Sequence, residues 1–323
     1  MSYGYQPRVI ERIRGDAPGP SLIGIGAMHG NEPAGVAVLR TVLGRLRQRG
    51  AKIRGDVMGL IGNVRALAAK RRFLARDLNR LWTQSRLEAL LPQDPWTTPT
   101  TDGAELAEML ELSGELDRAL AAKRGSVFVL DLHTTSAPGV AFGVAGATPA
   151  HRGFAAKFPM PVIVGLEELL DGVLTRHLAT KGCVTLAIEG GQTDSADAGA
   201  LLEAAITVAL AASGCVLPGD LPELPGARDL LTRARGALPP MIDVTLRHEV
   251  RPEHEFRMEP GFANIHATPA GTLLARDKRG EIRAPYDGFV LLPLYQAQGN
   301  DGFFYGKATT APVGGRPPTN PAA

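Results

Sequence analysis

The chain has 323 residues, 44% of them hydrophobic, which is enough for a large core and for two domains of ordinary size. Lysine and arginine number 35 against 33 aspartate and glutamate, so the net charge of +2 provides no strong bulk attraction for nucleic acid or an anionic membrane. Two cysteines exclude a disulfide scaffold and a cysteine-rich zinc module, and they suit a reducing compartment.

We expect a cytoplasmic protein without a membrane span. The N-terminus lacks the apolar core of a signal peptide. The longest apolar stretch, residues 201–217, is rich in alanine and interrupted by Glu203, which predicts a packed helix. The sequence leaves the oligomeric state open, a homo-oligomer included.

Strand-like and helix-like segments alternate through the first half of the chain. Pro33 suits the first turn of a helix, where its missing N–H would be unpaired in any case. The alternation predicts an α/β fold with a mixed, mainly parallel sheet flanked by helices. The expected strands are residues 22–25, 57–61, 127–130, 140–144, 162–164 and 184–188, and the expected helices are residues 33–49, 105–120 and 197–213.

The character of the sequence changes near residue 215. Residues 216–225 hold three prolines and read as a loop, and β-rich segments follow at residues 242–249, 272–274 and 288–294. We therefore expect three regions: a catalytic domain over residues 1–224, a small β domain over residues 225–310 that shapes substrate access, and a disordered tail over residues 311–323.

Polar side chains follow the predicted strands at the edge where ligands gather in parallel α/β folds. His29 and Glu32 lie three residues apart at a strand-to-helix junction, and His133 follows the strand 127–130. Two histidines and a carboxylate with an open position are typical of catalytic zinc, although another divalent ion would also fit. Each motif alone is a weak signal, because a histidine in a glycine-rich turn is more often a packing or capping residue. Asp131 shares a strand face with His133 and is positioned to orient it.

Glu189 directly follows the apolar strand 184–188 and precedes two glycines. A carboxylate in such surroundings is costly to bury unless it is paired or functional. Two interpretations stay open: a general base that activates water beside the metal, and a cap for the helix that begins near Asp197.

Residues 70–80 are the most basic segment of the chain. A solvated basic surface is the usual explanation, and the low net charge with a single stacking aromatic, Phe73, argues against nucleic acid. If the segment folds toward the metal, its arginines can bind a carboxylate bidentately or stabilise an oxyanion.

Two further patterns are weaker. Residues 24–30 are similar to a dinucleotide-binding loop, but the third glycine comes one residue late and no acidic residue follows at the required distance. His248, His254 and His266 lie near several glutamates, but an alternating β segment predicts that these side chains face solvent.

Several motifs in order carry a resemblance to a known family. They are GAMHGNE, RRFLARDLNRLW, VLDLHTT and AIEGG, with GFANIHATPAGTLLA near the C-terminus. Over roughly residues 20–305 the chain resembles the succinylglutamate desuccinylase/aspartoacylase family, a branch of the zinc carboxypeptidase-like metallohydrolases. The resemblance implies a zinc carboxypeptidase-like fold.

The resemblance also implies roles for individual residues. One zinc ion per chain would be held by His29, Glu32 and His133, with Glu189 as the catalytic carboxylate. Arg72 would polarise the substrate carbonyl, and Asn79 with Arg80 would bind a substrate carboxylate.

The sequence departs from the aspartate-specific members at two positions. Their arginine about ten residues before the catalytic glutamate is replaced by Ala179, and their pocket-closing tyrosine corresponds only loosely to Tyr305. These departures leave the acyl group and the amino acid of the substrate open.

The expected function is zinc-dependent hydrolysis of the amide bond of a small, anionic N-acyl amino acid or a related carboxylate-bearing amide, with no nucleic-acid or membrane partner. Two alternatives stay open: a zinc carboxypeptidase acting on peptides, and a metal-binding protein without catalysis.

Overall fold

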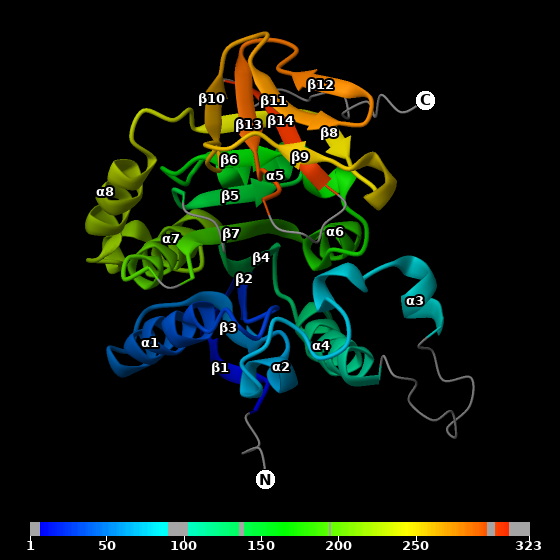
Figure 1. The fold of residues 1–323 in the computed structure, drawn as a ribbon. Coiled ribbons are helices and arrows are strands. Elements are labelled where there is room, and N and C mark those ends of the chain that lie inside the picture. Colours follow the sequence, from blue (N-terminus) through cyan, green and yellow to red (C-terminus); the bar gives the residue numbers. More distant parts are fainter. Residues whose placement is uncertain (1–6, 90–102, 136–138, 194, 296–300, 310–323) are drawn as a thin grey trace.

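The computed structural model describes residues 7–89, 103–135, 139–193, 195–295 and 301–309. It contains one 11-stranded mixed sheet with helices on both faces, and a separate three-stranded sheet (Figure 1). The predicted α/β class is confirmed. None of the helices in the described residues has the length and apolar character needed to span a membrane.

The large sheet has two parallel blocks in its middle, joined by one antiparallel pair, and it is antiparallel at its ends. Its strands are β1 (Val9–Arg14), β2 (Ala17–Gly26), β3 (Arg54–Ile61), β4 (Val127–Thr135), β5 (Phe142–Ala145), β6 (Val162–Val164), β7 (Val184–Gln192), β8 (Met241–Glu249), β10 (His266–Thr268), β13 (Gly288–Leu291) and β14 (Asp301–Thr309). Their spatial order is β1-β3-β2-β4-β7-β5-β6-β8-β14-β13-β10. The pairs within β3-β2-β4-β7 and within β5-β6-β8 are parallel, and the remaining pairs are antiparallel.

Eight α-helices and four 3-10 turns connect the described strands. The helices are α1 (Ala34–Gln48), α2 (Val64–Ala68), α3 (Gln84–Ala89), α4 (Gly103–Ala121), α5 (Pro149–Ala155), α6 (Leu174–Thr180), α7 (Ala198–Ser213) and α8 (Leu224–Arg235). The 3-10 turns are η1 (Leu78–Arg80), η2 (Glu167–Leu169), η3 (Pro218–Asp220) and η4 (Pro252–His254).

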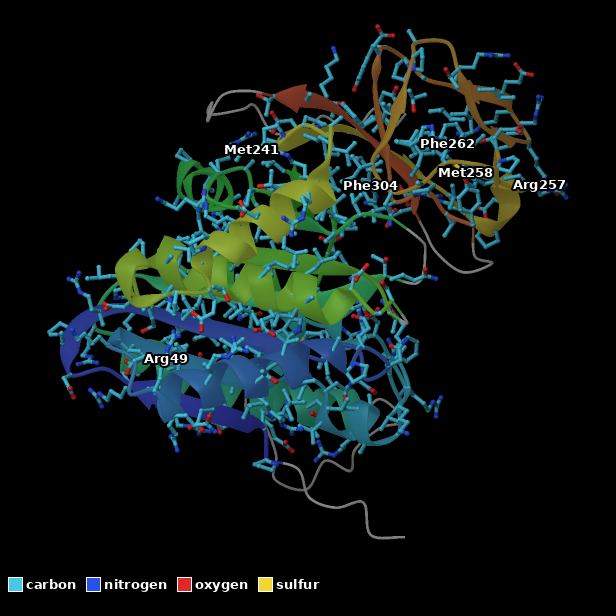
Figure 2. The ribbon with its side chains drawn as sticks, turned by 90° about the vertical axis from the view of Figure 1, so that its left-hand side faces the viewer. Arg49, Met241, Arg257, Met258, Phe262 and Phe304 are labelled. Carbon is cyan, nitrogen blue, oxygen red and sulfur yellow. The ribbon has the colours of Figure 1, made fainter. Side chains whose placement is uncertain are left out.

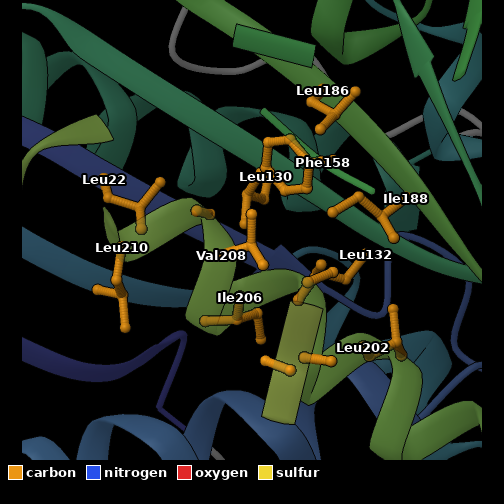
Figure 3. Packing of buried hydrophobic residues seen from close by; sticks show 14 of the residues in the cluster. Leu22, Leu130, Leu132, Phe158, Leu186, Ile188, Leu202, Ile206, Val208 and Leu210 are labelled. Carbon is orange, nitrogen blue, oxygen red and sulfur yellow. The ribbon is translucent and has the colours of Figure 1, made fainter. Parts of the chain in front are cut away.

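Side chains alternate between the two faces of the central strands. On one face, Leu130 and Leu132 of β4 lie in the same core cluster as buried residues of α1 and α7, as Figure 3 shows for α7. On the other face, Val129 of β4 belongs to a cluster with residues of α4 and α6. Because the period of a strand is two, Asp131 and His133 lie on the same face as Val129.

Two central strands run further than the sequence predicts. β4 continues to Thr135 and β7 continues to Gln192, so Asp131, His133 and Glu189 lie inside strands and not after their ends. The parallel register places His133 directly beside Glu189. The extended strands therefore fix both side chains on one face of the sheet.

The C-terminal region is rich in β-structure and lies at the opposite end of the large sheet from β1 (Figure 1). β8, β14, β13 and β10 continue the large sheet, while β9 (Arg257–Met258), β11 (Leu273–Asp277) and β12 (Gly280–Arg283) form the small one. Figure 2 shows the labelled Met258 and Phe262 in this region, well separated from the layer that contains Arg49. The domain boundary at residues 224/225 stays a prediction, and the predicted tail lies outside the described residues.

The expected loop at residues 216–225 differs from the structure. It contains η3 and the first turn of α8. The physical reason is that Pro218 and Pro225 occupy the first turn of each element, where proline costs no hydrogen bond.

Candidate active site

A tight turn between β2 and α1 places the first two site residues. Ala27 has a φ of 56°, a left-handed conformation that costs a residue with a Cβ about 1–2 kcal/mol. Gly30 lies so close to α2 that a Cβ there would be 2.1 Å from the carbonyl carbon of Ala66. This strained, closely packed turn directs the buried side chains of His29 and Glu32 toward the end of β4.

His29, Glu32 and His133 converge as the sequence predicts. His29 Nδ1 lies 2.9 Å from Glu32 Oε1, and His133 Nδ1 lies 3.0 Å from Glu32 Oε2. One ligand atom of each residue lies within 4.8 Å of the others, so the group can hold a metal ion. The backbone N–H of Thr134 also donates to Glu32 Oε2, at 3.2 Å.

The second ring nitrogen of each histidine faces another carboxylate. His133 Nε2 lies 2.9 Å from Asp131 Oδ2, and His29 Nε2 lies 3.2 Å from Asp77 Oδ1. Such contacts fix the tautomer and orientation of metal-binding histidines and raise their basicity. The sequence predicts Asp131 but not Asp77, whose signal is its place at the start of the motif D-L-N-R, five residues after Arg72.

The charges in this cluster keep Glu32 ionised and attract positive charge to the two histidines. Although burial opposes ionisation, hydrogen bonds with His133 and His29 hold the pKa of Glu32 well below its usual range. Burial lowers the pKa of His133, but the charge of Asp131 and the hydrogen bonds outweigh it, so that the pKa is raised well above its ordinary value. The carboxylate is therefore ionised at neutral pH, and the histidines lie in a field that attracts positive charge.

Glu189 lies next to this cluster but is not bonded to it. Its Oε2 atom is buried and has no hydrogen-bond partner in the described part of the chain. The pKa of Glu189 is raised to about 7, mainly by burial. The charges of His133 and His29 oppose this rise, and the charge of Glu32 adds to it. The capping interpretation finds no support, because no hydrogen bond joins Glu189 to α7 or to Asp197, all of which the structure describes.

Arg72 lies at the exposed side of the cluster. Its Nη1 is 3.5 Å from Glu32 Oε1 and its Nη2 is 3.1 Å from Asp77 Oδ2. The side chain is 46% exposed, so its guanidinium can meet a ligand that enters from solvent. The segment that the sequence identified as basic thus folds toward the histidines.

Asn79 and Arg80 lie in η1, beside α6. Asn79 Oδ1 accepts the N–H of Leu174 at 2.9 Å, and Asn79 Nδ2 donates to Asp131 Oδ2 at 3.5 Å. Arg80 is exposed, and its Nη1 donates to the carbonyl of Asn79 at 2.8 Å. Both polar groups of the Asn79 amide are therefore engaged within the protein.

Tyr305 lies elsewhere. It is fully buried in β14, and its hydroxyl donates to the carbonyls of Thr268 and Tyr286. Its hydrogen-bond partners, its aromatic neighbour and its core cluster all belong to residues 245–305. The structure does not bring Tyr305 to the other predicted site residues.

The second histidine group does not form a comparable site. Among the described residues, His29, Glu32 and His133 are the one group with metal-binding geometry. The ring of His248 instead stacks on Phe303, with centroids 5.1 Å apart.

Comparison with known proteins identifies the family. The model of the succinylglutamate desuccinylase/aspartoacylase catalytic domain matches residues 18–209, more than half of the chain. The chain belongs to this family. The matched region contains every predicted site residue except Tyr305, so the resemblance read from the motifs is confirmed. No curated protein sequence matches the chain.

Solved structures of the family share the fold of this chain. Succinylglutamate desuccinylase from Vibrio parahaemolyticus is 17% identical, with a TM-score of 0.64 over 94% of this chain and 86% of that one. A succinylglutamate desuccinylase/aspartoacylase from Rhodobacter sphaeroides is 17% identical, with a TM-score of 0.65 over 93% and 88%. The ectoine utilization protein EutE (DoeB) from Ruegeria pomeroyi is 18% identical, with a TM-score of 0.61 over 92% and 88%.

Proposed function

We propose that this protein is a zinc-dependent hydrolase that cleaves the amide bond of a small N-acyl amino acid or a related carboxylate-bearing amide. One observation carries the proposal: two histidine nitrogens converge on Glu32 beside Glu189, a carboxylate with a buried, unpaired oxygen. Membership of a family of deacylating hydrolases supports it. So do the names of structural relatives, which refer to succinylglutamate and to ectoine utilization.

The residues fit a zinc ion by the chemistry of their donor atoms. His29 Nδ1, His133 Nδ1 and the Glu32 carboxylate are three protein ligands, the number typical of catalytic zinc. The carboxylates of Asp77 and Asp131 contact the Nε2 atoms of His29 and His133, the ring nitrogens that face away from Glu32. When bound, zinc would act as a Lewis acid toward the substrate carbonyl and would lower the pKa of water to about 7.

Glu189 acts as the general base in this proposal. Its buried carboxylate accepts the proton of the attacking water and then delivers it to the leaving nitrogen. A pKa of about 7 suits both steps at neutral pH, because a group near its pKa can both accept and donate a proton.

The arginines of the 72–80 segment would bind the substrate. The half-exposed guanidinium of Arg72 stabilises the negative charge that develops on the carbonyl oxygen. Arg80, exposed at the end of η1, binds the carboxylate of the amino acid, and Asn79 holds Arg80 in place through its bonds to Leu174 and Asp131. This arrangement would orient the scissile bond toward Glu189.

The decisive experiment is a hydrolysis screen of the zinc-loaded protein. The panel pairs N-acyl amino acids with amides that lack the free carboxylate and with short peptides. We expect the N-acyl amino acids to react fastest, and we expect Glu189→Gln to keep its zinc while kcat falls at least about 100-fold.

Each other outcome favours a different interpretation. Faster turnover of peptides would favour a carboxypeptidase. No hydrolysis across the panel with zinc bound would favour a metal-binding protein without catalysis. Full activity of Glu189→Gln would remove Glu189 as the base.

A further inference from the structure

Glu105, at the start of α4, is fully buried and binds the backbone of a distant segment. Its Oε1 accepts the N–H of Leu74 at 2.6 Å, and its Oε2 accepts the N–H groups of Ala75 at 3.0 Å and Arg76 at 3.3 Å. Asn63 Nδ2 donates to the same carboxylate at 3.4 Å. Three consecutive backbone N–H groups thus surround one carboxylate.

These hydrogen bonds matter because the segment has little structure of its own. Residues 71–77 form neither helix nor strand, so their position depends on contacts with neighbours. Consecutive N–H groups make a concave site for an anion, and hydrogen bonds to an ionised carboxylate are stronger than bonds between neutral groups. Since α4 packs in the core through Met109, Leu112 and Leu116, Glu105 is a fixed point for the segment.

The segment carries two residues of the proposed site. Arg72 lies two positions before Leu74, and Asp77 directly follows Arg76. Asp77 contacts both His29 and Arg72. The backbone of Arg72 is also held by the N–H of Gly30, which donates to its carbonyl. Displacement of residues 74–76 would therefore move both the guanidinium and the carboxylate that faces His29.

We propose that Glu105 is a positioning residue for the reaction: by holding the backbone of residues 74–76, it places Arg72 and Asp77 against the metal cluster. This inference rests on the proposed deacylase function, and it assigns to Glu105 no contact with the substrate.

Glu108 offers a matched control on the same helix. It lies one turn further along α4, is equally buried, and also accepts backbone N–H groups, from Val64 at 2.9 Å and from Arg65 at 3.1 Å. These bonds hold the first turn of α2 and not the segment of Arg72. Glu108→Gln therefore matches Glu105→Gln in burial and in the loss of a charged acceptor of backbone N–H groups, and it additionally removes the ion pairs of Glu108 with Arg8 and Arg65, but it leaves residues 74–76 in place.

The test compares both variants in the zinc-loaded protein, with and without Arg72→Ala. We expect Glu105→Gln to lower kcat roughly 10–100-fold with a smaller change in KM, since a displacement of about 1 Å can cost a factor of that size. In the Arg72→Ala background the same change should cost clearly less than in wild type, because the part of its effect that passes through Arg72 is already lost and only the part through Asp77 remains. Glu108→Gln should lower stability without the fall in kcat.

A second readout does not depend on activity. Hydrogen exchange of the backbone amides of residues 74–76 should accelerate in Glu105→Gln and not in Glu108→Gln. If Glu105→Gln does not fold, Glu105→Asp, which keeps the charge on a shorter side chain, takes its place in both measurements.

Three results would overturn the inference: unchanged exchange at residues 74–76, an equal loss of kcat with and without Arg72, or an equal loss in Glu108→Gln. A wild-type protein that hydrolyses no amide would instead refute the proposed function. The exchange measurement would still decide whether Glu105 holds the segment.

Discussion

At the scale of single residues, Glu167 is a buried carboxyl group that the proposed chemistry does not use. It lies in η2 and is only 4% exposed, and its Oε1 has no hydrogen-bond partner in the described part of the chain. Burial raises the pKa of Glu167 to about 8, with smaller contributions from the charges of Glu168 and Asp131 and an opposing hydrogen bond with Thr175. The group is therefore mainly protonated at neutral pH.

This pKa predicts how stability depends on pH. The folded protein binds the proton of Glu167 more tightly than the unfolded chain, so its contribution to stability is present below pH 4.5 and is lost as the pH rises through about 8. Glu167→Gln carries no such group. As the pH rises from 5 to 9, we expect the free energy of unfolding of wild type to fall relative to that of Glu167→Gln. The difference should change by at most about 4 kcal/mol over this range.

Urea denaturation of the metal-free proteins at several pH values measures this difference. Glu253→Gln, which changes an exposed glutamate, is the control and should follow wild type. A constant difference between wild type and Glu167→Gln across this range would contradict the raised pKa.

The residues of the metal cluster and the supporting Asp131 could be predicted from the sequence, and the supports Asp77 and Glu105 could not. His29, Glu32 and His133 are rare ligand types at the ends of recognisable strands, and the parallel-sheet rule brings those ends together. Asp77 contacts a ring nitrogen of His29, 48 residues away in the sequence. Glu105 accepts hydrogen bonds from backbone N–H groups about 30 residues away. No hydrophobic period or motif spacing encodes such bonds.

At the scale of elements, the packing of η1 against the start of α6 determines where Arg80 lies. Asn79 accepts the first N–H of α6, and the N–H of Trp82 donates to the carbonyl of Gly172 at 3.1 Å. Gly172 has a φ of 70°, and a Cβ there would lie 2.3 Å from the carbonyl oxygen of Arg80. The close approach of the two backbones therefore requires glycine.

Gly172→Ala should disturb the substrate-binding segment. The left-handed φ costs alanine about 1–2 kcal/mol, and the overlap with Arg80 adds to this. Gly182→Ala is the matched control, because Gly182 has a φ of 82° and nothing lies within 4 Å of the position that a Cβ would take there. We expect Gly172→Ala to lose more stability than Gly182→Ala in chemical denaturation, and also to raise KM for carboxylate-bearing substrates. Equal effects of the two substitutions would argue against the contact.

The sequence predicted the long elements better than the short ones. α1 and α4 show clear helical spacing of apolar residues, α7 is a long, alanine-rich apolar stretch, and β6 matches its predicted residues 162–164. α6 and η1 are too short for a periodic signal, and they form because Asn79 and Gly172 join them. The extra length of β4 and β7 also escaped prediction, because polar residues such as His133 and Glu189 hide a strand that continues into the site.

At the scale of the whole molecule, the last described strand lies inside the sheet. β14 pairs with β8 on one side and β13 on the other. It contributes Phe303, Phe304 and Tyr305, each at most 2% exposed, to two core clusters. The cluster of Phe304 also contains residues of β5 and β6, and the cluster of Phe303 and Tyr305 lies in the C-terminal region. The strand therefore connects the central sheet to the β-rich region.

Truncation tests this arrangement. We expect a chain that ends at residue 300 to lose cooperative unfolding of the C-terminal region and to melt at least about 10 °C below the full chain, since burying each large aromatic side chain contributes roughly 3–5 kcal/mol. A chain that ends at Thr309 keeps every described strand and should melt with the full chain. Differential scanning calorimetry compares the three, and equal melting of the 300-residue chain would contradict a structural role for β14.

The position of β14 also affects how the protein is made. Synthesis proceeds from the N-terminus, so the turn between β2 and α1, together with β4 and β7, leaves the ribosome long before Asp301. These segments carry the metal cluster and Glu189. Until residues 301–309 emerge, β8 has an unpaired edge and β13 lacks the strand that connects it to the large sheet. The nascent chain thus exposes an open sheet edge until residues 301–309 have been synthesised. We therefore expect the need for chaperones during expression to depend on residues 301–309, even though the proposed chemistry is contained in the first two hundred residues.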